Sequence, residues 1–389
     1  MTHWGTGLAI SSFKLVAKRL KETLRTGDTV GRLGGDEFAL ILSDLASSDD
    51  ATVAAQKLMQ VLERPFELDG RELFIAVSAG ITLSPEDGTD PDTLIKNADI
   101  AMYRAKEMGR TNYQFYKSEM NARSLERMSL DSHLRRALER NEFVLHYQPK
   151  VDLTTGRITG LEALLRWQHA EFGLVAPGRF IPILEDNGLI VQVGEWVLSE
   201  ACRQLDVWNN EKLQALSVSL NLSGRQLQQK GLETSIKRVV SETSTDPRLI
   251  ELEITESVLM RNPEQAARIL RQVKDMGMRL SVDDFGTGYS SLSYLKSFPL
   301  DALKIDRSFV KDLVSGSDDA AIVQAIVALA KSLNLRTIAE GVEDAAQLAL
   351  LKALGCNEYQ GYYFARPLPP DQLTKLLRER AAVQATIGK

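Results

Sequence analysis

The sequence predicts an α/β protein in which a small mixed α+β domain precedes a (β/α)8 barrel. Beyond residue 142, eight apolar strand candidates alternate with helical patterns, and such alternation over about 250 residues is typical of this barrel. A doubly wound open sheet is the alternative architecture, but no GxGxxG follows a strand candidate. At 389 residues, the chain is long enough for two or three domains.

Residues 1–117 are predicted to form the small domain because strands and helices are mixed there. Its expected elements are a helix over 11–25, a hairpin over 29–42, a helix over 50–63, a strand over 73–83, a helix over 91–109 and a strand near 113–116. Gly34 and Gly35 lie where the hairpin must turn. The charged stretch 118–141 lacks Gly and Pro, which predicts a semi-rigid linking helix.

Residues 142–389 are predicted to form the barrel domain. The strand candidates are 143–152, 157–167, 216–222, 249–256, 278–284, 302–308, 336–341 and 358–364. The expected helices include 190–208, 263–276, 318–333, 344–354 and 370–381. Since the active site of such a barrel lies at the C-terminal ends of its strands, polar residues at those ends are the candidates for function.

Composition narrows the classes of function. The net charge of −5 offers no support for binding a nucleic-acid polymer or an anionic membrane. No apolar run is long enough to span a bilayer and no signal-peptide pattern is present, so we expect a cytoplasmic location. Cys202 and Cys356 lack a CxxC partner and are expected to be buried structural thiols. The four histidines are scattered, so a metal would need oxygen ligands, which favours Mg²⁺ or Mn²⁺.

Seven consecutive strand candidates each carry a polar residue in or beside an apolar run. These residues are Glu162, Asn221, Glu253, the pair Asp283 and Asp284, Lys304, Glu340 and Gln360. A carboxylate inside a core strand is costly unless it is paired or metal-bound, and any one of them taken alone could be a satisfied structural acid. Seven such positions at one rim favour a shared site for hard divalent cations, because the set contains carboxylates and two amides but no histidine.

Two features of this set concern phosphate chemistry. Asp283 and Asp284 are adjacent, so one can bridge two metals while the other reaches a single metal. Lys304 is expected to orient the attacking water or neutralise charge on a phosphate, or else to pair with a neighbouring acid, and both roles are compatible.

The segment 285–295 (FGTGYSSLSYL) suits a mobile loop, with a tight strand-to-helix connection as the alternative, and Glu256 is placed to anchor that loop.

The order of motifs resembles one known family. GLEALLRW at 160–167 is similar to the signature of EAL-domain cyclic di-GMP phosphodiesterases, and the resemblance covers about residues 142–380. The other matching motifs are YQPKVDL (147–153), SLNLSGRQL (219–227), ELEITES (251–257), SVDDFGTGYSSL (281–292), LKIDRSFV (303–310), TIAEGVE (337–343) and QGYYFARPL (360–368). The resemblance implies metal-dependent hydrolysis of cyclic di-GMP to linear pGpG by a two-metal-activated water, with Mg²⁺ or Mn²⁺ as the metal.

The resemblance also implies a role for each matching residue. One metal would be held by Glu162, Asn221, Glu253 and Asp283, and the second by Asp283, Asp284 and Glu340. Lys304 would activate water, Gln360 would support the ligands, Glu256 would anchor the loop, and Gln148 and Arg166 would contact substrate. The family further implies a homodimer formed through this domain near 285–295.

The motif RLGGDEF at 32–38 resembles the GGDEF domain of diguanylate cyclases. The motif itself consists of Gly34, Gly35, Asp36, Glu37 and Phe38, and the resemblance implies that its two acids bind metal and that the lobe binds GTP or cyclic di-GMP. Arg25 and Asp28 match the family's RxxD inhibitory site. The family's first strand, with a metal-binding Asp, has no counterpart here, so we expect a truncated, regulatory domain without cyclase activity.

Two alternatives to a phosphodiesterase stay open. One is a cyclic di-GMP receptor that binds the nucleotide without cutting it. The other is a bifunctional cyclase and phosphodiesterase within a longer parent protein, whose sensory region or membrane anchor would lie upstream. Incubation with GTP, and with cyclic di-GMP in the presence of metal, separates the three.

Overall fold

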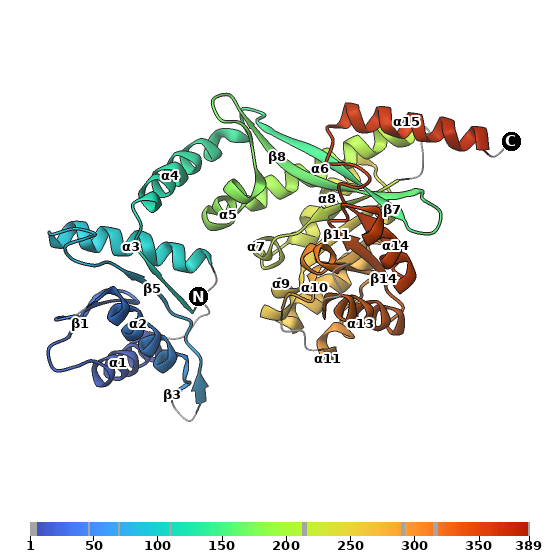
Figure 1. The fold of residues 1–389 in the computed structure, drawn as a ribbon. Coiled ribbons are helices and arrows are strands. Elements are labelled where there is room, and N and C mark those ends of the chain that lie inside the picture. Colours follow the sequence, from blue (N-terminus) through green and yellow to red (C-terminus); the bar gives the residue numbers. More distant parts are fainter. Residues whose placement is uncertain are drawn as a thin grey trace. The chain divides into compact units, whose positions relative to one another are not determined.

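A computed structural model of the protein describes residues 6–45, 47–68, 71–108, 111–211, 216–288, 292–313 and 318–387 (Figure 1). The chain divides into two compact units, Met1–Ser129 and Leu130–Lys389. The division falls within helix α4 (Glu119–Ala137), which occupies most of the predicted linking helix. The predicted domain boundaries, after residue 117 and after residue 141, therefore remain a prediction. No helix in the described ranges combines the length and apolarity that crossing a bilayer requires.

The first unit is a mixed α+β structure with three small sheets. Its elements are α1 (Thr6–Thr23), β1 (Thr29–Gly34), β2 (Glu37–Ile41), α2 (Ser48–Glu63), β3 (Phe66–Leu68), β4 (Arg71–Leu73), β5 (Ser78–Ile81), α3 (Pro91–Glu107) and β6 (Asn112–Phe115). The pairs β1–β2 and β3–β4 are antiparallel, whereas β5 and β6 are parallel. A small core containing Val16, Leu20, Leu62 and Phe66 joins α1 and α2 to β3.

One predicted strand of this unit is wrong in its extent. The apolar run 73–83 was expected to be continuous, but β4 ends at Leu73 and β5 begins at Ser78. The chain changes its pairing partner between these points, because β4 pairs back with β3 while β5 pairs with β6. Phe74, in the intervening segment, is exposed despite its apolar side chain.

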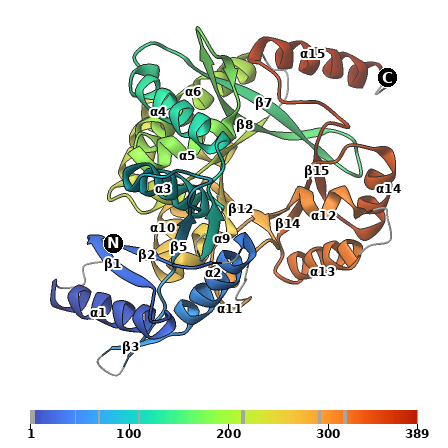
Figure 2. The same cartoon turned by 60° about the vertical axis from the view of Figure 1, so that its left-hand side comes forward.

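The second unit contains a closed barrel (Figure 2). Its strands are β7 (Phe143–Asp152), β8 (Ile158–His169), β9 (Gly173–Val175), β10 (Ser217–Asn221), β11 (Ile250–Thr255), β12 (Arg279–Phe285), β13 (Ala302–Ile305), β14 (Arg336–Glu340) and β15 (Glu358–Gln360). The sheet order runs from β10 through β15 to β7, β8 and β9, and β10 also pairs with β8. That last pairing closes eight strands into a ring, as the sequence predicts.

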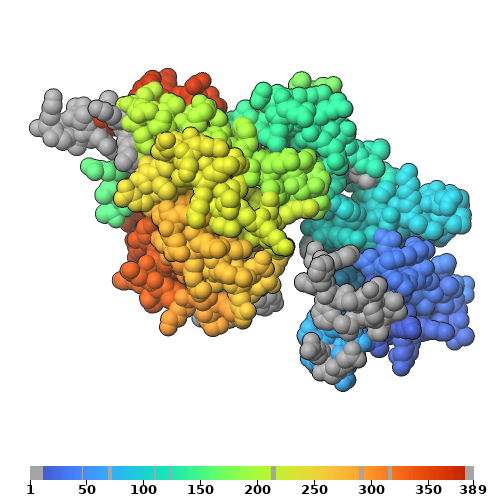
Figure 3. Space-filling model, turned by 180° about the vertical axis from the view of Figure 1, so that it is seen from behind, coloured from blue at the N-terminus to red at the C-terminus, as the bar shows by residue number. Residues whose placement is uncertain are grey.

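Helices surround this ring. They are α5 (Pro177–Asn187), α6 (Ile190–Asn210), α7 (Gly224–Leu227), α8 (Leu232–Thr243), α9 (Glu256–Arg261), α10 (Pro263–Asp275), α11 (Leu292–Leu295), α12 (Arg307–Lys311), α13 (Asp318–Ser332), α14 (Ala345–Leu354) and α15 (Pro370–Ile387). In Figure 2, α13 and α14 lie side by side outside β14, where they contact each other. In the view from behind, the yellow and gold segment that includes α8 and α10 lies at the surface (Figure 3).

The barrel departs from a regular (β/α)8 order at its first strand. β7 is antiparallel to both of its neighbours, β15 and β8, whereas the other seven strands of the ring are parallel. A hairpin joins β7 to β8, so no helix separates them in the described residues 153–157. The Asp152 carboxylate stabilises this hairpin turn, because it accepts hydrogen bonds from the backbone N–H groups of Thr154 and Thr155.

The parallel strands are buried on both faces, which explains their near-continuous apolar runs. Leu161, Ile250, Leu280 and Leu303 from four of them are fully buried in one core. Both cysteines are free and buried, which confirms the prediction of structural thiols. An inward-facing charge in such strands must find partners inside the barrel.

Candidate active site

Lys304 lies at the centre of the predicted site. Its side chain, on β13, is fully buried among acids from four other strands. The ammonium Nζ lies 2.6 Å from Glu340 Oε1, 3.0 Å from Asp283 Oδ1 and 3.6 Å from Glu162 Oε2. It also forms a short contact with Glu253 Oε2. The acids that the sequence places at separate strand ends therefore meet at one mouth of the barrel.

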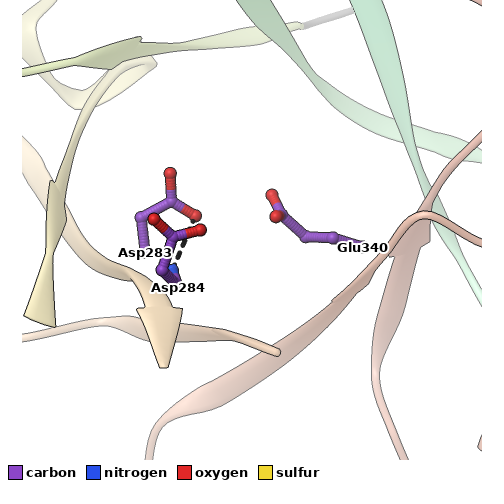
Figure 4. Close-up of side chains that lie close together, drawn as sticks. All are labelled: Asp283, Asp284 and Glu340. Carbon is purple, nitrogen blue, oxygen red and sulfur yellow. Dashed lines mark hydrogen bonds between the residues drawn. The ribbon is translucent and has the colours of Figure 1, made fainter. Parts of the chain in front are cut away.

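A bulge directs both adjacent aspartates into this mouth. Neighbouring residues of a regular strand point to opposite faces, so Asp283 and Asp284 would not share a site in an ordinary strand. The pairing of β12 with β13 shifts between Val282 and Phe285, and Asp284 has φ 53°. Asp and Asn adopt this left-handed conformation more readily than other residues. The extra residue turns the second carboxylate toward the first, and Asp284 donates its backbone N–H to Asp283 Oδ1 at 3.1 Å (Figure 4).

Three carboxylates of the site form a cluster beside Lys304. Oxygens of Asp283, Asp284 and Glu340 all lie within 4.8 Å of one another (Figure 4). Burial, with the nearby charges of Asp283 and Asp306, raises the pKa of Asp284 to about 6. Burial also raises the pKa of Glu340 to about 8. Lys304 opposes this rise only in part, and repulsion from Asp283 and Glu162 increases it. The cluster holds more negative charge than Lys304 can balance.

These residues fit a divalent cation with oxygen ligands. A cation would relieve the repulsion that raises the two pKa values, and carboxylates are the ligands that Mg²⁺ and Mn²⁺ prefer. Gln360 Oε1 supports the same interpretation, because it is buried and has no hydrogen-bond partner in the described part of the chain. A buried amide oxygen of this kind is satisfied by an additional ligand or a water.

Amides hold Glu162 on the other side of the site. Asn221 donates from Nδ2 to Glu162 Oε1 at 2.7 Å, and Gln360 donates from Nε2 to Glu162 Oε2. Gln360 Nε2 also donates to Gln148 Oε1 at 2.9 Å, and Gln148 donates to the carbonyl oxygen of Ala365 at 3.0 Å. Gln148 therefore positions Gln360 in this structure, and its contact with substrate stays a prediction.

The two remaining predicted residues flank this site. Arg166 lies four residues after Glu162 on β8, on the same face of the strand, and is half-buried. Burial lowers the pKa of Arg166 although Glu162 opposes the shift. Glu256, the first residue of α9, is buried and accepts a hydrogen bond from the Gly286 backbone N–H at 2.9 Å. This contact ties the start of the 285–295 loop to the first residue of α9, whereas residues 289–291 of that loop lie outside the described ranges.

The motifs of the first unit lie on exposed structure. Gly35, with φ 52°, and Asp36 form the turn of the β1–β2 hairpin, and Gly34 is the last residue of β1, paired with Glu37. The acids at 36 and 37 are exposed, while Phe38 is half-buried. The Asp28 carboxylate accepts hydrogen bonds from the backbone N–H groups of Arg25, at 2.9 Å, and Ser43. Asp28 thus stabilises its own turn, and nucleotide binding by Arg25 and Asp28 stays a prediction.

Sequence reasoning missed several charged residues of the barrel strands and one residue at a strand end. The strand residues are Lys150 on β7, Glu251 on β11, Arg336 on β14 and Glu358 on β15, and the other is Asp306, which follows β13 and lies beside Asp284. The signal was available, because Lys150 and Glu251 interrupt apolar strands within the motifs YQPKVDL and ELEITES. Burial alone would lower the pKa of Lys150, but Glu251 and Glu253 raise it above its ordinary value.

Comparison with known families decides the assignment. The model of the EAL domain matches residues 131–367, which is more than half of the chain. The chain belongs to the EAL domain family. The model of the diguanylate cyclase GGDEF domain matches residues 2–112, so the two domains occur in tandem with GGDEF first. The resemblances in both halves of the sequence are thereby confirmed.

Individual relatives of this EAL protein agree with the assignment. The bifunctional diguanylate cyclase/cyclic di-GMP phosphodiesterase MucR of Pseudomonas aeruginosa is 48% identical over 92% of this chain and 52% of its own length. The cyclic di-GMP phosphodiesterase PdeR of Escherichia coli is 42% identical over 91% of this chain and 53% of its own length. The chain thus spans about half the length of these curated relatives.

A solved structure supports the barrel fold. It is the PaMucR phosphodiesterase in complex with c-di-GMP, which is 51% identical and has a TM-score of 0.62. The match covers 63% of this chain and 99% of that chain. The shared part has the size of the second unit, which carries the acid cluster.

Proposed function

We propose that the second unit hydrolyses one phosphodiester bond of cyclic di-GMP to give linear pGpG, with Mg²⁺ or Mn²⁺ as cofactor. The observation that carries the proposal is the convergence of four acids on one buried lysine at a single mouth of the barrel, with Asp284 as a fifth acid beside them. The names of MucR and PdeR as cyclic di-GMP phosphodiesterases support the choice of substrate. The c-di-GMP complex of PaMucR supports it for the barrel unit in particular.

Two sets of ligands would hold two cations. One set is Glu162, Asn221, Glu253 and Asp283, and the other is Asp283, Asp284 and Glu340. When bound, a pair of divalent cations supplies a potent oxygen nucleophile at neutral pH and stabilises the charge on both the attacking and leaving oxygens. The bulge at Asp283 and Asp284 is what lets β12 give both of its carboxylates to the second set.

The remaining side chains would act on substrate and protons. Once the acids are neutralised by cations, the ammonium of Lys304 is available to donate hydrogen bonds to the attacking water or a phosphate oxygen. Arg166 offers planar N–H donors to a phosphate oxygen of the substrate. Gln360 keeps Glu162 in place through Nε2, and Glu256 holds the loop after Asp284 through Gly286.

The first unit has a regulatory role in this proposal. We infer that the hairpin of the GGDEF motif binds GTP or cyclic di-GMP without cyclase activity in this chain. We further infer that the protein works in the cytoplasm as a homodimer formed through the EAL domain. The GGDEF motif is placed for such binding, because its exposed acids Asp36 and Glu37 lie at a hairpin turn that a nucleotide can approach.

Product analysis tests this proposal directly. Purified protein is incubated with cyclic di-GMP in Mn²⁺, in Mg²⁺ and in EDTA, and the nucleotides are separated by chromatography. We expect pGpG in both metals and none in EDTA, and we expect Glu162→Ala to abolish the product. Binding of cyclic di-GMP without cleavage in either metal would instead identify a receptor. A parallel incubation with GTP that yields cyclic di-GMP, or the pGpG made from it, would contradict the proposed silence of the GGDEF domain.

A further inference from the structure

A second set of charged side chains lies inside the barrel, one layer closer to the N-terminal ends of the parallel strands. Lys150 Nζ lies 2.9 Å from Glu251 Oε1, and Arg336 donates to Glu251 Oε2 at 3.0 Å and to Glu358 Oε1 at 2.7 Å. Lys150, Glu251 and Glu358 are buried, and Arg336 is partly exposed. Two cations and two acids make this lower layer electrically balanced.

Glu253 connects the lower layer to the active site. Its Oε1 accepts a hydrogen bond from Lys150 Nζ at 2.7 Å, while its Oε2 accepts from Lys304 Nζ. The carboxylate is thus held between two lysines, one from each layer. Charges alternate in sign along the path from Arg336 through Glu251, Lys150 and Glu253 to Lys304.

Lys150 has little freedom to leave this position. An ammonium has three donors, and Lys150 directs its Nζ to Glu251 Oε1, Glu253 Oε1 and Ser219 Oγ. Glu251 is fixed in turn, because its Oε1 also accepts from Ser219 Oγ at 3.1 Å and Ser281 Oγ at 3.3 Å. Residues of β10 and β11 therefore hold the ammonium that holds Glu253, and Ser281 on β12 supports Glu251.

We propose that Lys150 is a positioning residue that engages Oε1 of Glu253, so that only Oε2 is presented to the catalytic cation. This inference rests on the proposed function, in which Glu253 is a metal ligand. A carboxylate that was free to rotate would alternate between one-oxygen and two-oxygen coordination, and it would also pair more fully with Lys304. Outer partners of this kind orient ligands and change metal affinity or activity by about 10- to 100-fold.

A charge-balanced double variant tests the proposal. Lys150→Met alone would leave Glu251 and Glu253 buried with too few cations, which is strongly destabilising. Lys150→Met/Glu251→Met removes one cation and one acid and leaves Glu253 without its Oε1 partner. The matched control, Arg336→Met/Glu358→Met, also removes one cation and one acid from the lower layer, but neither residue contacts Glu253 among the interactions of the described structure.

The measurements are Mn²⁺ binding by electron paramagnetic resonance, thermal unfolding, and kcat and KM for cyclic di-GMP. For the Lys150→Met/Glu251→Met variant we expect Mn²⁺ affinity and kcat each to fall about tenfold or more, with KM changed by less than about threefold. The control should retain wild-type Mn²⁺ binding even if its melting temperature falls. Equal Mn²⁺ affinity in the two double variants would overturn the role of Lys150.

The design separates this inference from the proposed function. A wild-type protein that binds Mn²⁺ but leaves cyclic di-GMP uncut would overturn the proposed function. The Mn²⁺ affinities of the two double variants would still test the positioning role of Lys150, because that measurement does not depend on turnover. Conversely, full turnover by the wild type together with unchanged Mn²⁺ binding and kcat in the Lys150→Met/Glu251→Met variant would overturn only the positioning role.

Discussion

The two charged layers inside the barrel differ in their balance. At the C-terminal mouth, Lys304 faces Glu162, Glu253, Asp283 and Glu340, and Asp284 adds to the same cluster. In the lower layer, Lys150 and Arg336 face Glu251 and Glu358, and the hydroxyl groups of Ser219 and Ser281 also donate to Glu251. The first layer has a large excess of acid, whereas the second has none.

This difference distinguishes a binding site from a structural network. Buried carboxylates that are fully paired keep a low pKa, and the pKa of Glu251 is about 2 because Lys150 and Arg336 outweigh the effect of burial. Carboxylates in excess have the opposite property, and the pKa of Glu340 rises to about 8. Strongly raised pKa values from burial and like charge are typical of functional sites. We therefore expect the unbalanced layer to bind cations and to lower the stability of the protein in their absence.

The largest effect is expected from removing an acid of the unbalanced layer. Glu340→Gln should lower turnover by about 10³-fold, since the lost cation ligand supplies several kcal/mol of transition-state stabilisation. The same change should raise the stability of the metal-free protein at pH 8, because it removes a carboxylate that burial and repulsion disfavour. Single-turnover kinetics and urea unfolding in EDTA measure the two effects. A loss of both activity and metal-free stability would remove the distinction between the layers.

The balanced layer should respond in the opposite way. Glu251→Gln leaves Lys150 and Arg336 short of one buried counter-charge, so we expect it to lower the free energy of unfolding by about 3 kcal/mol. Turnover per folded molecule should stay within about threefold of wild type, because Lys150 still contacts Glu253 through a separate hydrogen bond. Urea unfolding gives the first quantity, and active-site titration with kinetics gives the second. A loss of turnover comparable to that of Glu340→Gln would show that the lower layer takes part directly in catalysis.

Much of this comparison could be predicted from the sequence. The barrel strands follow from apolar runs separated by helical patterns, and the acids of the mouth follow from their positions at the ends of those runs. Lys304, inside the run 302–308, was expected to pair with neighbouring strand-end acids, and it does. These features depend on the pattern of apolar residues within short segments and on the rule that the C-terminal ends of the barrel strands meet at one face.

Other features depend on pairing between distant segments. The antiparallel direction of β7 follows from a hairpin at 153–157 that looks like any other short connection in the sequence. The bulge at Asp283 and Asp284 is defined by the pairing of β12 with β13, which places these two residues opposite one residue of β13. The sequence of β12 alone does not reveal this register. Lys150 was overlooked for the same reason, since its partners lie on strands about one hundred residues away.

The smallest expected effect is a difference in pH dependence between the layers. Glu340 has a folded-state pKa of about 8, above its ordinary 4.5, so its ionisation should destabilise the metal-free protein progressively as pH rises from about 4.5 to 8. Glu251 has a folded-state pKa of about 2, so its contribution is fully present above pH 4.5 and is lost only as pH falls toward 2. Of the two layers, only the mouth of the barrel should therefore make stability depend on pH between pH 5 and 8.

Urea unfolding in EDTA at pH 5, 6, 7 and 8 measures this dependence for the wild type, Glu340→Gln and Glu251→Gln. We expect the wild type to lose about 4 kcal/mol over this range, since a group that titrates across it changes stability by up to about 1.4 kcal/mol per pH unit. Glu340→Gln should flatten the dependence, whereas Glu251→Gln should lie below the wild type and parallel to it. Saturating Mn²⁺ should reverse the slope, because protons and the cation compete for the same oxygens and the cation wins as pH rises. A Glu340→Gln curve parallel to the wild type would mean that the excess charge of the mouth is already neutralised without metal.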